Sequence, residues 1–507
     1  MRRLFLASLC LAALLLTMPA ARATWSILAV DRATGEVAVA GATCINGSNL
    51  VRFLPVIRVG VGAGVAQAEI DNGARNRQLM WKGLQQRLSP QEILDVIEHF
   101  DARFQNRQMG IVDFEGRVLT FTGSQAADWA GGVTGTVGTI TYAIQGNILT
   151  GSPVVTAAES AFRESAADLA TRLVKAMDAA RNMGGDGRCS CSNSNPTGCG
   201  SPPPNFLKSA QVGFIQIARI GDQDGTCTGQ TGCATGEYYM TLNVRGNQVN
   251  KPDPVDQLID KFVEWRADWL GRPDHLKSEV IPRELTLLSG VQPVRTVKIV
   301  LRDWNGDRVT TPMQSIDVSA VDPGASAVLL GEPVAQGDGV YLLPVRASGP
   351  LLGRVRLKIT VDDGQGPVTL YPYLEISVAP PRALIANTEQ LSSSLGDDLS
   401  LSMRGGPGLA NRQYLILASA SGSSPGFSVG NLYIPLVFDP LVWFTFENCG
   451  TAALPGTCGV LDELGRAEAA ALLEPGDLAA VVSGELTLAA IVRGDYVSEP
   501  VTVQVLP

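Results

Sequence analysis

The predicted elements change in kind near residue 272, and this change limits what the chain can fold into. Before it, apolar strands alternate with amphipathic helices; after it, short strands are separated by turns rich in glycine, proline and aspartate. Strands, then paired helices, then strands again predict two antiparallel sheets covered by helices. We therefore expect an α+β fold, a four-layer αββα sandwich, followed by two all-β sandwich modules. The expected domains are residues 24–275, 292–380 and 381–507, with a linker over residues 272–293.

Individual strands and helices can also be predicted. Thr24–Val30 and Glu36–Thr43 alternate like the two strands of a hairpin. A glycine-rich apolar strand is expected over Val56–Ala68, and one long helix over Pro153–Arg181. In the last module, the aromatic run Val442–Phe446 predicts a strand.

The first residues have the features of a secretion signal. A basic start, an apolar run, a break and two small residues follow one another, namely Arg2 and Arg3, Leu4–Leu16, Pro19, and Ala21 and Ala23. We expect residues 1–23 to be removed after Ala23, which would make Thr24 the first residue of the mature protein. The protein is then secreted or periplasmic.

The overall charge excludes one large class of partner. The net charge is −9, and removal of Arg2, Arg3 and Arg22 takes it to −12. An acidic protein of this kind is not expected to bind nucleic acid. No apolar run after the signal reaches membrane-spanning length, so we expect no membrane span.

Eight of the nine cysteines follow the signal segment. An even number in an exported chain predicts disulfides, with connectivity that the sequence does not define. The short spacings Cys227/Cys233 and Cys449/Cys458 suit small closed loops. Cys189-x-Cys191 leaves a metal site as the alternative, but zinc would need more ligands than this histidine-poor chain offers.

Histidine is nearly absent from the sequence. His99 lies in an amphipathic helical pattern, and His275 lies in the expected linker, so we interpret both as structural. This scarcity disfavours serine-histidine-aspartate chemistry and histidine-rich metal sites. No cofactor and no metal are expected.

Thr24 offers a different chemistry. An N-terminal threonine carries a hydroxyl and a free amine on one residue, and the amine, with a pKa near ~7.7–8, can act as the base for the hydroxyl. The structural alternative is that Thr24 merely follows the cleavage site.

The segment from Thr24 to about Trp269 resembles the bacterial and archaeal domain of unknown function 1028 (DUF1028) family, which is grouped with the N-terminal-nucleophile (Ntn) hydrolases. The similar segments occur in the family's order: Thr24–Asp31, Thr34-Gly35-Glu36, Val65–Ala68, Gln108–Asp113, Phe121-Thr122-Gly123, Gln145–Leu149 and Gly184-Gly185-Asp186. The resemblance implies the αββα sandwich and a nucleophilic first threonine. The sequence departs from the family's pattern at residues 188–204 and 221–236. The last 200 or so residues more loosely resemble β-modules of secreted bacterial proteins.

We expect an exported Ntn-type amidohydrolase that cleaves an amide bond in a small amide or peptide. Thr24 is the expected nucleophile, Asn147 or Gln67 the donor to the oxyanion, and Asp31 the group that orients the amine. The alternative is a non-catalytic binding or scaffold protein. The β-modules are expected to serve as spacers or to make cell-surface contacts.

Overall fold

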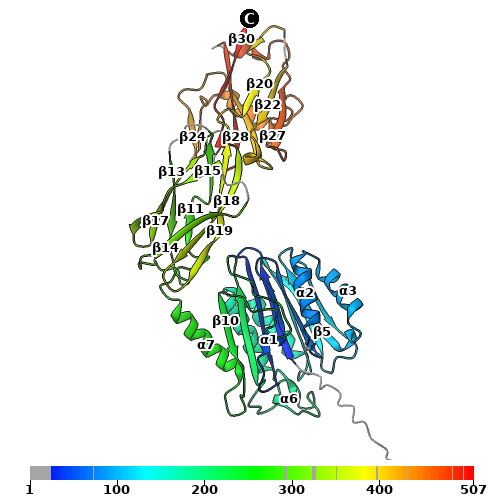
Figure 1. Ribbon diagram of the computed structural model, residues 1–507. Coiled ribbons are helices and arrows are strands. Elements are labelled where there is room, and N and C mark those ends of the chain that lie inside the picture. Colours follow the sequence, from blue (N-terminus) through cyan, green and yellow to red (C-terminus); the bar gives the residue numbers. More distant parts are fainter. Residues whose placement is uncertain are drawn as a thin grey trace, which may run out of the picture. The chain divides into compact units, whose positions relative to one another are not determined.

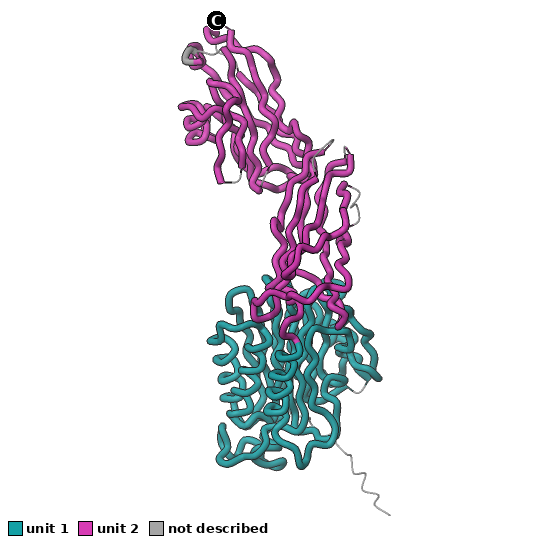
Figure 2. The backbone as a smooth tube through the Cα atoms, turned by 90° about the vertical axis from the view of Figure 1, so that its left-hand side faces the viewer, with its two compact units in different colours: residues 1–268 teal, residues 269–507 magenta. Residues whose placement is uncertain are grey.

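The computed structural model describes residues 24–71, 73–289, 294–322, 327–349, 351–395, 398–430, 432–481, 484–494 and 496–506. The expected signal segment, residues 1–23, lies outside them. The chain divides into two compact units, residues 1–268 and 269–507 (Figure 2). No helix in the described part of the chain is long and apolar enough to cross a membrane.

Two antiparallel sheets form the first unit (Figure 1). The six-stranded sheet has the order β10-β9-β2-β1-β8-β7, and the four-stranded sheet has the order β3-β4-β5-β6. Their strands are β1 (Thr24–Asp31), β2 (Glu36–Thr43), β3 (Pro55–Arg58), β4 (Gly62–Ala68), β5 (Arg107–Asp113), β6 (Val118–Thr122), β7 (Gly131–Val137), β8 (Ile140–Asn147), β9 (Val212–Ala218) and β10 (Met240–Val244).

Helices pack on the outer face of each sheet. One buried cluster joins Trp25 and Ile27 of β1 to α4, α5 and α7, and another joins Met109 and Ile111 of β5 to α2 and α3. A third, with Leu28 of β1, fills the layer between the sheets. The helices are α1 (Leu50–Phe53), α2 (Arg75–Gln85), α3 (Pro90–Phe100), η1 (Phe104–Asn106), α4 (Pro153–Glu164), α5 (Leu169–Asn182), α6 (Gly187–Ser190) and α7 (Pro254–Asp268).

Two element predictions in this unit need correction. The expected single helix over Pro153–Arg181 is two helices, because Asp168 caps a new one by accepting the Thr171 N–H at 3.0 Å. The expected strand Val56–Ala68 is the hairpin β3–β4, whose turn holds Gly60 at φ +65°.

The second unit is built from β-modules. In the first module, a β11-β13-β17-β15 sheet shares one core with a β12-β19-β18-β14 sheet, and β16 pairs with β17. The strands are β11 (Glu279–Ile281), β12 (Glu284–Leu288), β13 (Arg295–Val300), β14 (Ser315–Ala320), β15 (Val328–Leu330), β16 (Val334–Gly337), β17 (Val340–Ala347), β18 (Gly353–Asp362) and β19 (Pro367–Ala379). The expected linker over residues 272–293 thus contributes β11 and β12 to the sheets.

The last module holds the remaining sheets and a helix. The strands are β20 (Leu384–Ala386), β21 (Gln390–Ser392), β22 (Leu399–Arg404), β23 (Gln413–Ser419), β24 (Phe427–Val429), β25 (Leu432–Ile434), β26 (Cys458–Val460), β27 (Arg466–Ala471), β28 (Glu485–Val492), β29 (Tyr496–Val497) and β30 (Val501–Leu506). Short helices lie at η3 (Pro407–Leu409), α8 (Pro440–Glu447) and η4 (Asp477–Ala480). The prediction of a strand over Val442–Phe446 is wrong: Asp439 caps α8, with Pro440 at its first position.

The fold prediction is therefore confirmed at its coarser level. A mixed α and β domain comes first, and β-sandwich-like modules follow. Disulfides are also confirmed, at Cys44–Cys189, Cys191–Cys199, Cys227–Cys233 and Cys449–Cys458. Such bonds persist in oxidising, exported environments.

Candidate active site

The layer between the two sheets of the first unit becomes polar at one end. Leu28 and Val30 of β1 belong to the apolar core of this layer. Side chains alternate along a strand, so Ser26 and Thr24 face the same layer. Both residues are fully buried. The candidate nucleophile thus lies at the polar end of an otherwise apolar layer.

Strand β8 continues the polar end beside β1. Thr24 pairs directly with Asn147, and Ser26 pairs with Gln145. Directly opposite residues of an antiparallel pair hold their Cβ atoms about 4.5–5.5 Å apart on one face. The structure therefore brings Thr24 and Asn147 together, although 122 residues separate them in the chain.

The facing sheet supplies two glutamines, Gln67 on β4 and Gln108 on β5, which pair with each other. The Ser26 hydroxyl donates to Gln67 Oε1 at 2.7 Å. Gln67 Nε2 donates to the Thr24 carbonyl oxygen at 3.1 Å and to Gln108 Oε1 at 2.8 Å. Gln108 Nε2 then donates to the Gly146 carbonyl oxygen at 2.8 Å. This chain of hydrogen bonds crosses from one sheet to the other and fixes the backbone of Thr24.

A glycine makes room for the next glutamine in this cluster. A Cβ atom on Gly110 would lie 2.8 Å from the end of the Gln145 side-chain amide, so a side chain there would displace Gln145. The Gln145 amide, oriented with its nitrogen toward the Met109 carbonyl oxygen, donates to that oxygen at 2.9 Å and accepts the Gly110 N–H at 3.0 Å. We call Thr24, Ser26, Gln67, Gln108, Gln145 and Asn147 the polar cluster.

The short helix α6 borders the polar cluster at the ends of β2 and β8. Asp186 is fully buried and accepts the Cys44 N–H at 2.7 Å, just beyond β2. It also pairs with Leu149, just beyond β8, and Cys189 of α6 forms a disulfide with Cys44. The Arg188 guanidinium donates to both Asp186 carboxylate oxygens, at 3.1 and 2.8 Å. A carboxylate and a cation are therefore fixed to the two strand ends that flank Thr24.

A glycine turn places Asp186. Gly185 has φ +56°, and a Cβ atom on it would lie 2.6 Å from the Trp25 ring. Only glycine adopts such a conformation in such close contact at low cost. The Gly184-Gly185-Asp186 turn thus joins the helix side of β1 to the border of the polar cluster.

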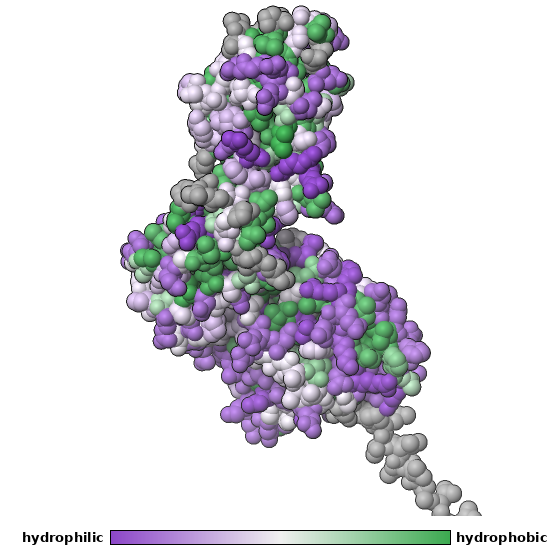
Figure 3. All heavy atoms as spheres, turned by 45° about the horizontal axis from the view of Figure 1, so that its top comes forward, coloured by the Kyte–Doolittle hydropathy of each residue, from purple (hydrophilic) through white to green (hydrophobic). Residues whose placement is uncertain are grey.

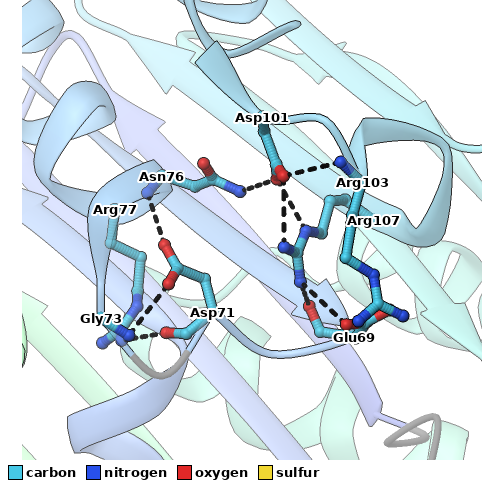
Figure 4. Close-up of polar contacts among 8 residues, drawn as sticks. All are labelled: Glu69, Asp71, Gly73, Asn76, Arg77, Asp101, Arg103 and Arg107. Atoms are coloured by element: carbon cyan, nitrogen blue, oxygen red, sulfur yellow. Dashed lines mark hydrogen bonds and ion pairs between the residues drawn. The ribbon is translucent and has the colours of Figure 1, made fainter. Parts of the chain in front are cut away.

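An ionic network borders the four-stranded sheet at the same end (Figure 4). Arg107, next to Gln108, donates to Asp101 at 2.8 Å and to the Glu69 carbonyl oxygen. Arg103 pairs with Glu69 at 2.6 Å. Burial alone would raise the pKa of Asp101, but hydrogen bonds from Arg107 and Asn76 outweigh it and hold that pKa below its usual range. Asp101 therefore stays ionised and anchors Arg107 beside the cluster.

The structure does not bring Asp31 to this site. Asp31 ends β1, and a strand of this length separates its ends by roughly 23 Å. Its carboxylate accepts the Thr139 hydroxyl at 2.6 Å and the Ala33 N–H at 3.0 Å. The expectation that Asp31 orients the Thr24 amine is therefore wrong in its geometry: Asp31 caps the β1–β2 turn instead.

The histidines also lie elsewhere. His99 is in the last turn of α3. His275 belongs to the second unit, where its Nδ1 contacts the Thr369 carbonyl oxygen and its ring stacks on Tyr371. Among the described residues, no three His, Cys, Asp or Glu side chains gather as a metal site. The polar cluster thus offers hydroxyl and amide groups, with ionic groups only at its border.

Sequence reasoning missed Ser26, Gln108, Asp186 and Arg188. A signal existed for the first two: in Thr24-x-Ser26, Gln108-x-Gly110 and Gln145-x-Asn147, alternate positions lose their apolar side chains at one end of a buried strand. Asp186 and Arg188 carried no local signal, because a distant disulfide and backbone contacts place them.

Comparisons with known proteins match the part of the chain that contains the polar cluster. A family model described as a family of unknown function, DUF1028, matches residues 24–194. No curated protein matches the chain. A Silicibacter pomeroyi protein described as DUF1028 is 21% identical with a TM-score of 0.34, over 49% of this chain and 93% of its own.

Two adhesin structures are also similar. FdeC of Escherichia coli is 10% identical with a TM-score of 0.22, over 95% of this chain and 97% of its own. InvE of Yersinia pseudotuberculosis is 15% identical with a TM-score of 0.17, over 45% of this chain and 58% of its own. The family match begins at Thr24 and includes Arg188, so the polar cluster and its α6 border lie in the segment that the DUF1028 family model matches.

Proposed function

We propose that the protein is an exported Ntn-type amidohydrolase whose nucleophile is the Thr24 hydroxyl. One observation carries the proposal. The central strand of the larger sheet begins with Thr24 inside a buried cluster of neutral polar side chains. Such a cluster supplies donors and acceptors without a competing charge, which suits stabilisation of a developing oxyanion.

Thr24 and Asn147 share the chemical steps. After cleavage before Thr24, its amine takes the hydroxyl proton, directly or through one water, as Oγ1 attacks the amide carbonyl. Asn147, directly opposite, donates to the oxyanion. The amine then returns the proton to the leaving nitrogen, and water releases the acyl group from Thr24.

Gln67 takes a positioning role in this proposal. Its amide nitrogen already donates to the Thr24 carbonyl oxygen and to Gln108, so it holds the nucleophile's backbone. The Asp186–Arg188 pair provides a fixed charge border against which a small amide or peptide would bind. The two sheets with helices on their outer faces are, in this proposal, an Ntn-like αββα sandwich.

Export of the protein is part of the proposal. The signal segment expected over residues 1–23 would be cut after Ala23, and four disulfides suit an oxidising compartment. The cut frees the amine that the mechanism needs.

The decisive test needs no known substrate. Sequencing of the mature N-terminus should give Thr24, and a start at any other residue contradicts the mechanism. A set of peptidyl epoxyketones then probes the site, because such a probe forms a ring with both the hydroxyl and the amine of an N-terminal threonine. We expect a stable adduct on Thr24 by peptide mass spectrometry, and none when the amine is acetylated beforehand.

A second candidate is a non-catalytic binding protein. This candidate is favoured because the Ser26 hydroxyl already hydrogen-bonds to the Gln67 side chain within the cluster. This candidate predicts the same N-terminus and no adduct with any probe of the set.

A further inference from the structure

Helix α8 of the last module presents its aromatic side chains to solvent. Trp443, Phe444 and Phe446 are 52%, 48% and 52% exposed, whereas Val442 and Thr445 of the same helix are buried. Figure 3 shows apolar side chains at the surface of the second unit as green patches between hydrophilic ones. Large exposed apolar groups that lie together indicate a contact surface. We call Trp443, Phe444 and Phe446 the aromatic platform.

The platform is held rigidly from beneath. Asp439 caps α8 by accepting the N–H groups of Leu441 and Val442 at 3.0 Å, and it also accepts the Ser419 hydroxyl at 2.9 Å. The Thr445 hydroxyl accepts the Ala418 N–H of β23 at 3.1 Å. The disulfide Cys449–Cys458 ties the chain after α8 to β26. A surface that is ordered before binding loses little entropy when a ligand arrives.

The charges of the sequence segment that contains the platform limit its partner. Between Arg412 and Arg466 the sequence contains no lysine or arginine and four acidic residues: Asp439, Glu447, Asp462 and Glu463. Nucleic acids and anionic membrane surfaces are bound through lysine and arginine, so this region does not suit them. Protein interfaces are enriched in methionine and arginine as well as in aromatic residues. This stretch contains neither methionine nor arginine.

The class of partner that is left is a neutral sugar polymer. The C–H face of a pyranose ring is flat and apolar and stacks on an aromatic face, whose π electrons attract polarised C–H groups. The Trp443 and Phe446 ring centroids lie 5.8 Å apart with planes inclined by 36°, which suits neighbouring sugars in a twisted chain. The exposed Glu447 carboxylate can accept sugar hydroxyl groups.

We propose that the aromatic platform on α8 binds a neutral polysaccharide by ring stacking, independently of chemistry at Thr24. The full mature chain should be retained on insoluble cellulose or chitin, or be retarded in gels that contain soluble xylan, glucomannan or dextran. High salt should leave this binding unchanged, because no ion pair is involved. The double variant Trp443→Ala with Phe446→Ala should bind at least about tenfold more weakly.

A matched control uses Phe100, which is 47% exposed in the first unit. Phe100→Ala should bind like the wild type, and circular dichroism should show both variants folded. Several results would overturn the proposal: no binding to any of these glycans, equal binding by the double variant, or binding only to acidic glycans or anionic vesicles. Concentration-dependent self-association that the double variant abolishes, without glycan binding, would assign the platform to a second copy of the chain instead.

Discussion

The polar side chains buried at the two ends of β1 differ in charge. At the Thr24 end, the groups between the sheets are neutral amides and hydroxyls. At the Asp31 end, the buried groups are charged: Arg219 donates to Glu36 at 2.8 Å and lies over the Tyr239 ring at 3.3 Å. Neutral groups need only hydrogen bonds when buried, whereas charges also need a partner charge. In the proposed function the Thr24 end carries the chemistry, whereas the ion pair at the Asp31 end holds β2 to β9.

Loss of the Thr24 hydroxyl should have the largest effect. Thr24→Ala should lower the rate of adduct formation and of amide turnover by ~10⁴ or more, because the covalent path is gone. Peptide mass spectrometry and a screen of small amides measure this. The matched change at the other end, Asp31→Asn, should leave both rates near the wild-type value and lower stability by about 1 kcal/mol. Equal rate losses in the two variants would contradict the division between the ends.

Loss of the buried cation should have the largest effect on stability. Arg219→Met leaves Glu36 buried without its partner charge, and this should lower the free energy of unfolding by about 3–5 kcal/mol. Urea unfolding at neutral pH measures the change. As a control, Arg117→Met removes an ion pair with Asp113 whose arginine side chain is 40% exposed, and it should cost less than Arg219→Met. Similar losses in both variants would show that the Arg219 pair has no special weight.

The charged groups at the Asp31 end should also make the stability of the first unit depend on pH. Burial raises the pKa of Asp222 to about 6, although its carboxylate accepts the Arg219 and Tyr239 N–H groups. The native state then binds more protons than the unfolded state between pH ~4 and ~6. Stability therefore falls as pH rises through this range, by up to roughly 3 kcal/mol from Asp222. Glu36, whose pKa burial also raises, adds to the fall.

Asp222→Asn isolates this contribution. Its amide oxygen can still accept the two N–H groups, but it does not titrate. In thermal unfolding from pH 4 to 7, the Tm of the variant should fall less with rising pH than the Tm of the wild type. Parallel curves would show that Asp222 titrates alike in the folded and unfolded chains.

The smallest of these effects is expected for Gln67 of the polar cluster. Gln67→Leu removes the partner of the Ser26 hydroxyl and the amide that supports Thr24, and it should destabilise the protein by about 1–3 kcal/mol without adding a pH dependence. Chemical unfolding at two pH values measures both. The exposed Gln91→Leu is the control and should be near neutral. A new slope between pH 4 and 7 in Gln67→Leu would mean that loss of the amide changes the titration of a group at the Thr24 end.

Local patterns predicted much of the first unit. The β1–β2 hairpin follows from alternation, which depends on neighbouring residues. The nearness of Thr24 to Asn147 and Gln67 could not be derived in this way. It depends on which strands pair and which sheets face each other, and single-sequence periodicity does not contain that information.

The two wrong predictions, for Asp31 and for Val442–Phe446, have different causes. The first depends on tertiary structure, and the second arises from competing local signals. Asp31 was expected to orient the Thr24 amine because it lies in the first hairpin, but the extended strand β1 separates the two residues. At Val442–Phe446, the strand preference of aromatic residues was outweighed by Asp439 and Pro440, which start a helix. The resulting helix exposes the rings of the aromatic platform, so this error concealed a candidate binding surface.

The Cys44–Cys189 disulfide has a consequence for when the site forms. It joins β2 to the loop of Asp186 and Arg188, across 145 residues. In a reducing cytosol this bond does not persist, and an uncut precursor has no free Thr24 amine. Under the proposed function, two independent events, oxidation and proteolysis, would then have to follow export before the hydrolase is complete. Newly made chains would thus not hydrolyse amides inside the producing cell.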